Sequence, residues 1–259
     1  MTSTLTPVLF DAPLVNPNSL GLYPAAQWTE SADPLRWLPS GVEIRPWNFG
    51  LTDSFGVWAA AWNARESDLG PDDVKQGQRP AGLAAFAAVT VWAADECDLT
   101  APSQVEVRTR AAQALRLMEQ GAVEREFAAR LLEDAATAET ATGLVAAVGH
   151  LEEVWATTNT QGGFIHARPS WAAPAAQANL LVRSGQGLTT PLGLRWVFGA
   201  GYRQVLADTL VVSSQPFGWR SEAAIRAAED LENSRFHAIA ERSLVVGYES
   251  LIGAVKVTG

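Results

Sequence analysis

The sequence predicts an α+β protein with two segments that project from its body. Three features of the 259 residues indicate this: a broken but apolar N-terminal stretch, a polar stretch between two extended segments, and a long stretch suited to one helix. Neither projecting segment can bury its own apolar side chains. We therefore expect a protein that associates with other chains.

Composition excludes several classes of function. With 47% hydrophobic residues and 259 positions the chain can bury a sizeable core. Its net charge of −9 argues against wrapping nucleic-acid phosphates as a main task. Cys97 is the one cysteine, so no intrachain disulfide is possible. We expect no secretory leader and no membrane span.

Residues 1–40 are rich in Pro, Asn, Ser and Thr, with scattered large apolar residues, which favours an extended arm lying on another surface. Extended segments at 36–50, 54–62 and 83–97 surround the polar stretch 63–82. This order predicts a large projecting hairpin or loop. We expect the chain ends, Met1 included, to be held by neighbouring molecules.

The next stretch predicts a helix over about 103–135, roughly 45 Å long. Ser103 and Glu106 have the spacing of a capping box, and Gly121 is the one glycine. One face is expected to carry the following residues: Leu115, Met118, Ala122, Leu131 and Ala135.

A second amphipathic helix is predicted after Thr142, its expected cap, and before Gly162. Its apolar stripe comprises Leu144, Val148, Leu151 and Trp155. A short strand at 164–167 follows, and then a helix over 171–181 capped by Ser170. The remainder is predicted to be rich in strands, with an ambiguous short helix at 222–232.

The histidines offer little evidence of chemistry. His166 could act as a general base with Ser170 or Cys97 as nucleophile, but no nucleophile-elbow motif is present, and we favour a structural role. His150 and His237 form no metal-ligand spacing with it. We expect no catalytic residue, no cofactor and no metal.

Two further patterns are weak. The acidic residues Asp68, Asp72 and Asp73 lack calcium-loop spacing and are interpreted as a solvated tip. The glycines at 199 and 201 lack the rest of a dinucleotide fingerprint.

The order of elements resembles the HK97-type capsid fold, shared by tailed-phage major capsid proteins and encapsulins. The stretch from Gly162 to Tyr202, with its "TTPLG" turn, is similar to a recurrent segment of capsid proteins, above all those of actinobacterial phages. The resemblance implies an N-terminal arm (1–40), an extended loop region (41–98), a peripheral domain with a spine helix (99–141 and 220–259) and an axial domain (142–219).

The resemblance implies a major capsid protein that self-assembles into pentamers and hexamers of an icosahedral head shell enclosing double-stranded DNA. It implies that the protein is not an enzyme. It also implies that the protein assembles in the host cytoplasm and is then located in the virion. The resemblance implies portal, decoration and scaffolding proteins as further partners. The scaffolding protein is expected to be a separate chain, because the roughly 100 residues before the spine helix leave no room for a fused scaffold.

Other functions stay open at this point. An encapsulin-type shell protein and another phage structural protein, such as a decoration or tail component, are the alternatives, and a hydrolase using His166 is a third. Some relatives of this fold form lysine–asparagine crosslinks. Lys75 could supply the lysine and Asn159, Asn179 or Asn233 the acceptor, but nothing in the sequence fixes that geometry.

Overall fold

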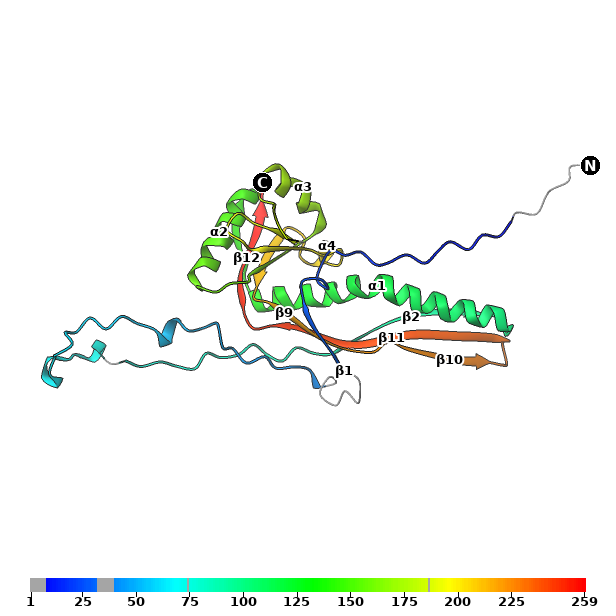
Figure 1. Cartoon of the computed structure of the whole chain (residues 1–259), viewed down its shortest axis with the longest axis horizontal. Coiled ribbons are helices and arrows are strands. Elements are labelled where there is room, and N and C mark those ends of the chain that lie inside the picture. Colours follow the sequence, from blue (N-terminus) through cyan, green and yellow to red (C-terminus); the bar gives the residue numbers. More distant parts are fainter. Residues whose placement is uncertain (1–7, 32–39, 74, 186) are drawn as a thin grey trace, which may run out of the picture.

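The computed structural model describes residues 8–31, 40–73, 75–185 and 187–259. Expectations about Met1, the first seven residues and 32–39 lie outside these residues. Figure 1 shows a compact body above a long helix and a long sheet, with the N-terminal segment leaving at one end and a loop at the other.

The helices and strands follow the predicted order of helix-rich and strand-rich regions. The described α-helices are α1 (Ala101–Ala135), α2 (Leu144–Thr157), α3 (Ala172–Gln177) and α4 (Tyr202–Val205). Short 3-10 turns are η2 (Thr52–Ser54), η3 (Glu66–Asp68), η4 (Pro71–Asp73) and η5 (Pro169–Trp171). The strands are β1 (Gln27–Ser31), β2 (Val89–Cys97), β3 (Glu139–Thr142), β4 (Phe164–Ala167), β5 (Val182–Ser184), β6 (Gly187–Thr189), β7 (Arg195–Phe198), β8 (Thr209–Ser213), β9 (Pro216–Ser221), β10 (Ala224–Asp230), β11 (Arg235–Tyr248) and β12 (Leu251–Thr258).

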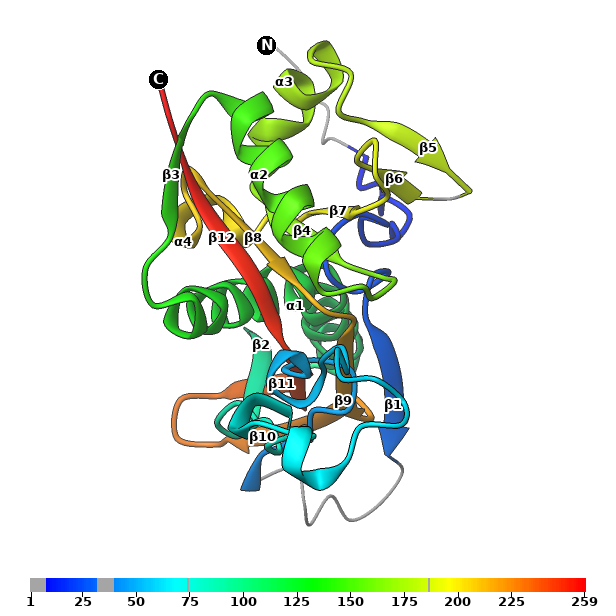
Figure 2. The same ribbon diagram turned by 90° about the vertical axis from the view of Figure 1, so that its left-hand side faces the viewer.

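Within the described residues the strands form two sheets. The five-stranded sheet has the order β1-β9-β11-β10, and β2 also pairs with β11. The seven-stranded sheet has the order β3-β12-β8-β4-β7-β6-β5. In the end-on view of Figure 2, α2 crosses the face of the seven-stranded sheet, and the five-stranded sheet lies on the other side of α1.

The helix α1 lies along the five-stranded sheet because every fourth side chain is apolar or turned inward. Its buried residues include Val107, Ala111, Leu115, Glu119, Val123, Phe127 and Leu131, a continuous i, i+4 stripe. The predicted helix is confirmed, with two corrections. It begins at Ala101 with Thr100 as the N-cap, so Ser103 is not its cap. Met118 is 70% exposed and lies off the buried face.

The helix α2 buries Leu144, Val148 and Leu151 as predicted. Its N-cap is Gly143, with a φ of 78°, because Thr142 is already paired in β3. It ends at Thr157, before the expected glycine, and Asn159 takes the left-handed conformation instead. Ser170 lies inside η5 and caps nothing. No helix of the described part is long and apolar enough to cross a membrane.

One strand assignment differs from the sequence prediction. Residues 224–230, read as an ambiguous helix, form β10, because pairing with β11 outweighs the helix propensity of alanine and glutamate. The strands β12 and β3 belong to the seven-stranded sheet, where they pair in parallel.

The two sheets share a core at the far end of α1. There Phe127 and Leu131 pack with Leu244, Tyr248 and Val197. Aromatic edges meet at this point, with Phe127 and Tyr248 ring centroids 5.6 Å apart. The base of each projecting segment is attached close to this core.

Candidate assembly surfaces

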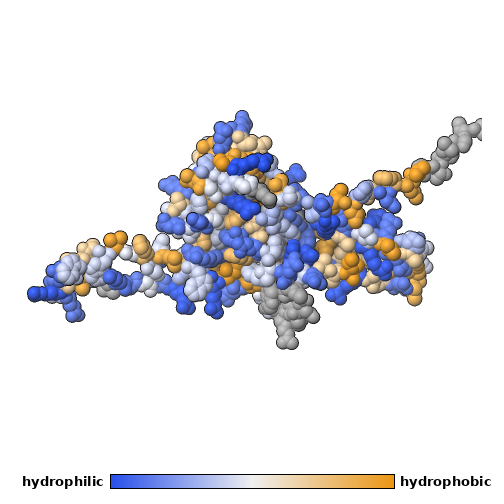
Figure 3. Space-filling view, in the orientation of Figure 1, coloured by the Kyte–Doolittle hydropathy of each residue, from blue (hydrophilic) through white to orange (hydrophobic). Residues whose placement is uncertain are grey.

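The first candidate surface is the arm, defined here as residues 8–20. Figure 1 shows this segment leaving the body above α1. Its exposed apolar side chains are Val8 (93%), Leu9 (96%), Phe10 (83%), Leu14 (62%), Val15 (61%) and Leu20 (55%). Figure 3 shows hydrophobic atoms along the arm. Fractions this high along a whole segment indicate a surface made for contact with another molecule.

Polar side chains of α1 hold the arm by its backbone. The Gln113 Nε2 donates to the carbonyl of Val15 at 2.8 Å. Three and seven residues further along α1, Arg116 donates to the side chain of Asn16 and Gln120 to the carbonyl of Leu20. This spacing places the three side chains on one helix face. The arm is therefore attached while its apolar side chains stay free.

Behind the arm, Tyr23 fixes the chain as it enters the body. Its hydroxyl donates to Glu119 Oε1 at 2.7 Å, and Arg242 lies 3.3 Å from the same oxygen. Burial and the Glu119 carboxylate raise the pKa of the Tyr23 hydroxyl, so it stays protonated as a donor. The chain then forms β1, which extends the five-stranded sheet in parallel with β9.

The second candidate surface is the loop, defined here as residues 43–85. Its base is closed by one antiparallel bridge between Val42 and Phe86, with N–O distances of 2.9 and 2.8 Å. Of the two predicted forms, hairpin or loop, the structure has a loop: between these points the described residues contain no strand, only three 3-10 turns. The loop projects without a body element beside it (Figure 1).

Two charged side chains of the body hold the two legs of the loop. Arg130 donates to the carbonyls of Ala84 (2.6 Å) and Ala85 (3.1 Å), and its guanidinium lies 4.2 Å from the centre of the Phe86 ring. Glu249 accepts from the backbone N–H groups of the other leg, at 47 and 48. Because such charge-assisted bonds are strong, the base has a defined direction.

The loop exposes large apolar side chains. They are Trp47 (78%), Leu51 (48%), Phe55 (82%), Val57 (88%), Trp58 (38%) and Trp62 (96%). Aromatic side chains are enriched at protein interfaces and often contribute most of their energy. The loop thus presents a second surface that the chain does not cover.

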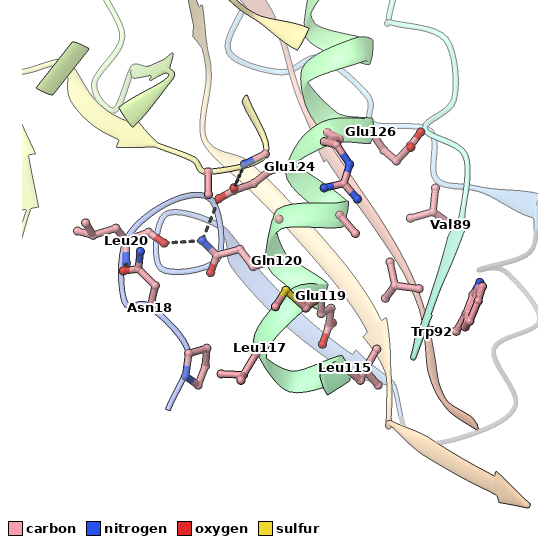
Figure 4. Close-up of a pocket in the computed structure, with 18 of the residues that line it drawn as sticks. Asn18, Leu20, Val89, Trp92, Leu115, Leu117, Glu119, Gln120, Glu124 and Glu126 are labelled. Atoms are coloured by element: carbon pink, nitrogen blue, oxygen red, sulfur yellow. Dashed lines mark hydrogen bonds between the residues drawn. The ribbon is translucent and has the colours of Figure 1, made fainter. Parts of the chain in front are cut away.

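A groove lies between the arm, α1 and β2. It has a volume of about 840 Å³ and exposes Met118 and Trp92 among its lining side chains. Figure 4 shows the arm on one side of α1 and β2 on the other, with Leu20 and Trp92 at the two edges. The groove is open and shows no convergence of nucleophile and base.

His166 is fully buried on β4 and makes two hydrogen bonds. The Ser213 hydroxyl donates to the Ser214 carbonyl at 2.9 Å, so it accepts from His166 Nε2 at 2.8 Å. The Nδ1 atom then accepts from the Tyr202 hydroxyl at 3.1 Å. Burial lowers the pKa of His166 to about 3, which keeps the ring neutral at physiological pH.

The structure does not bring the suggested catalytic groups together. The partners of His166 are Tyr202 and Ser213, whereas Ser170 is exposed in η5 and Cys97 lies on β2 of the other sheet. His150 lies 3.1 Å from Glu139, and His237 lies 3.4 Å from Glu96. Among the described residues, no group of three or more His, Cys, Asp or Glu side chains is arranged to hold a metal.

The suggested crosslinking residues are also far apart within one chain. Lys75 lies over the Trp58 ring, 4.3 Å from its centre, on the distal loop. Asn159 follows α2, and Asn179 follows α3. Asn233 is bonded to Asp230 in the β10–β11 turn, at the end of the molecule opposite the loop (Figure 1). Any such bond would have to join two copies.

The sequence prediction missed the residues that anchor the projecting segments. Glu124, Arg130 and Glu249 bind backbone groups between 45 and 202 positions away. One available signal was a glutamate at position 124 beside the apolar stripe of a helix, where a solvated residue is normally expected.

No protein-family model matches the sequence, and no curated protein matches it. Solved structures match over nearly the whole chain. A structure of Mycobacterium phage Adephagia has a TM-score of 0.58 at 12% identity, covering 99% of this chain and 96% of that chain. The asymmetric unit of the bacteriophage PhiM1 mature capsid gives 0.53 at 10% identity, with 98% and 93% covered. The capsid structure of the cyanophage P-SCSP1u gives 0.53 at 9% identity, with 98% and 92% covered. The chain therefore has the HK97-like α+β fold found in phage capsids, and the predicted fold class is confirmed.

Proposed function

We propose that the chain is the major capsid protein of a tailed phage. In this proposal it self-assembles into pentamers and hexamers that form the icosahedral head shell around double-stranded DNA. The observation that carries the proposal is the pair of anchored projecting segments, whose apolar side chains stay exposed among the described residues. The capsid fold, matched over 98% of the chain, supports it.

Each part of the fold has a place in this function. The arm and the loop would cover neighbouring subunits, burying apolar area at about 25 cal/mol per Å². The five-stranded sheet with α1 would form the peripheral domain. The seven-stranded sheet with α2 and α3 would form the axial domain that meets its copies at five-fold and six-fold centres.

The proposed role is structural, not enzymatic. His166 has no exposed surface and both ring nitrogens are bonded, so no substrate could reach it without local opening. The net charge of −9 suits a shell that encloses DNA without binding it tightly. Portal, decoration and a separate scaffolding protein would be further partners, and assembly would take place in the host cytoplasm before the protein becomes part of the virion.

Electron microscopy of the purified full chain tests the proposal. We expect closed icosahedral particles, formed alone or with a co-expressed scaffolding protein. Trp62→Ser should reduce their yield at least tenfold, whereas Trp62→Phe, the matched control, should retain most of it, because Trp62 is 96% exposed and needs an apolar partner.

The unfolding midpoint of the unassembled subunit should be equal in both variants. Particles that form equally well with Trp62→Ser would contradict the role of the loop. A monomer under every condition would contradict the proposed function. Particles that enclose a host enzyme in place of DNA would favour the encapsulin alternative.

A further inference from the structure

One carboxylate lies where the arm, α1 and the turn before α4 meet. Glu124 has no exposed surface. Its Oε1 accepts the N–H of Leu22 at 2.9 Å, and its Oε2 accepts the N–H of Gly201 at 2.8 Å. Gln120 donates to Oε1 at 2.9 Å and to the carbonyl of Leu20 as well, as the dashed lines in Figure 4 show. Three chain segments therefore converge on one side chain.

Three glycines make room for this carboxylate. A Cβ on Gly21 would lie 2.1 Å from Glu124 Oε1, and one on Gly199 would lie 2.7 Å from Glu124 Cδ. A Cβ on Gly201 would lie 2.6 Å from Glu124 Cβ. Gly21 also has a φ of 93°, in the left-handed region that favours glycine. The backbone is thus built around the carboxylate from the arm and from the body.

Burying this group is costly for the subunit. Desolvation raises the pKa of Glu124, although its hydrogen bonds with Gly201, Leu22 and Gln120 act in the opposite direction. Among the described residues no basic side chain forms an ion pair with it. An apolar side chain would fill the space at lower cost, but it would leave two backbone N–H groups without acceptors and would give no direction to the arm.

We propose that Glu124 is the positioning residue of the arm: one carboxylate that binds the Leu22 and Gly201 N–H groups fixes the direction in which the arm leaves the subunit. Gly201 belongs to the turn between β7 and α4, so the arm is aligned with the seven-stranded sheet as well as with α1. This inference rests on the proposed function only in giving the arm a neighbouring subunit to reach. The alignment itself is a property of the unassembled chain.

Spin labels on the full-length, unassembled protein test the alignment. The labels are attached at Asp11→Cys on the arm and Ser170→Cys on η5, both exposed positions, in a Cys97→Ser background. Double electron–electron resonance should give one narrow distance distribution. Glu124→Gln places an amide NH₂ against a backbone N–H, so we expect the distribution to broaden at least twofold. Glu126→Gln, an exposed neighbour on α1, is the matched control and should leave it narrow.

A second variant changes the backbone just after the arm and keeps the Glu124 carboxylate. Gly21→Ala would drive its Cβ into Glu124 and Gln120, and we expect the same broadening with an unfolding midpoint close to that of the parent. If Glu124→Gln does not fold, Gly21→Ala decides the question. Narrow distributions in every folded variant would overturn the inference, whether or not shells form. Absence of shells from the parent protein would overturn the proposed function and leave the distance result unaffected.

Discussion

Burial of His166 should make the subunit less stable in acid. The ring is fully buried, and its pKa falls from the ordinary 6.5 to about 3. Below pH 6.5 this histidine binds a proton in the unfolded chain but not in the folded chain. The contribution of the neutral ring to folding stability is therefore fully present above pH 6.5 and is lost as pH falls toward 3. Each pH unit in this window costs about 1.4 kcal/mol, and pH 5.0 therefore costs about 2 kcal/mol.

Denaturant unfolding of the unassembled subunit, followed by tryptophan fluorescence at several pH values, measures this. His166→Gln can still bond Tyr202 and Ser213, but it cannot titrate. It should be less stable than the parent at pH 7.5 by about 1–3 kcal/mol, because it loses the ring contact with Phe127.

That difference should shrink by about 2 kcal/mol at pH 5.0. His237→Gln, which removes a half-exposed histidine of the other sheet, is measured beside it for comparison. A constant difference between parent and His166→Gln from pH 7.5 to 5.0 would refute the reasoning, because it would mean that the buried ring binds its proton as readily as an unfolded one.

Three further predictions concern the same subunit. The pKa of Glu124 is raised, so its contribution to folding stability changes with pH in the opposite direction to that of His166. This contribution is fully present below about pH 4.5 and is lost as pH rises. In the same unfolding assay, the stability of the parent relative to Glu124→Gln should therefore fall from pH 4.5 to 7.5. Leu131→Ala should lower the free energy of unfolding by about 2–5 kcal/mol, since Leu131 is fully buried. Met118→Ala, on the exposed face of α1, should change it by no more than about 0.5 kcal/mol. Equal effects of the two variants would contradict the assigned helix face. Gly247→Ala would place a Cβ 2.6 Å from the Phe86 ring and should make the loop several-fold more sensitive to protease. Gly149→Ala, with open space around it, should leave the cleavage rate unchanged. Equal cleavage of the two variants would show that Phe86 does not hold the loop base.

The sequence predicts elements whose cause is local. Helix α1 is predictable because 35 residues contain one interior glycine and keep an apolar residue at nearly every fourth position. Helix α2 has the same kind of stripe. The two projecting segments were expected because their apolar residues fit no regular period.

What the sequence could not predict depends on distant partners. Residues 224–230 have helix-forming alanine and glutamate, yet their backbone groups pair with β11. Nothing in the local sequence distinguishes the anchoring role of Glu124 or Glu249. That role depends on backbone N–H groups 102 and 202 positions away in the chain.

The body holds the arm and the loop in the same manner. Gln113 and Gln120 donate to arm carbonyls, Arg130 donates to loop carbonyls, and Glu249 accepts loop N–H groups. Backbone groups are present at nearly every position, so these anchors do not restrict which side chains the two segments carry. The side chains are consequently available for contacts between subunits. Substitutions of exposed apolar residues should therefore alter association and leave subunit folding unchanged, whereas substitutions of the anchoring residues should redirect a whole segment.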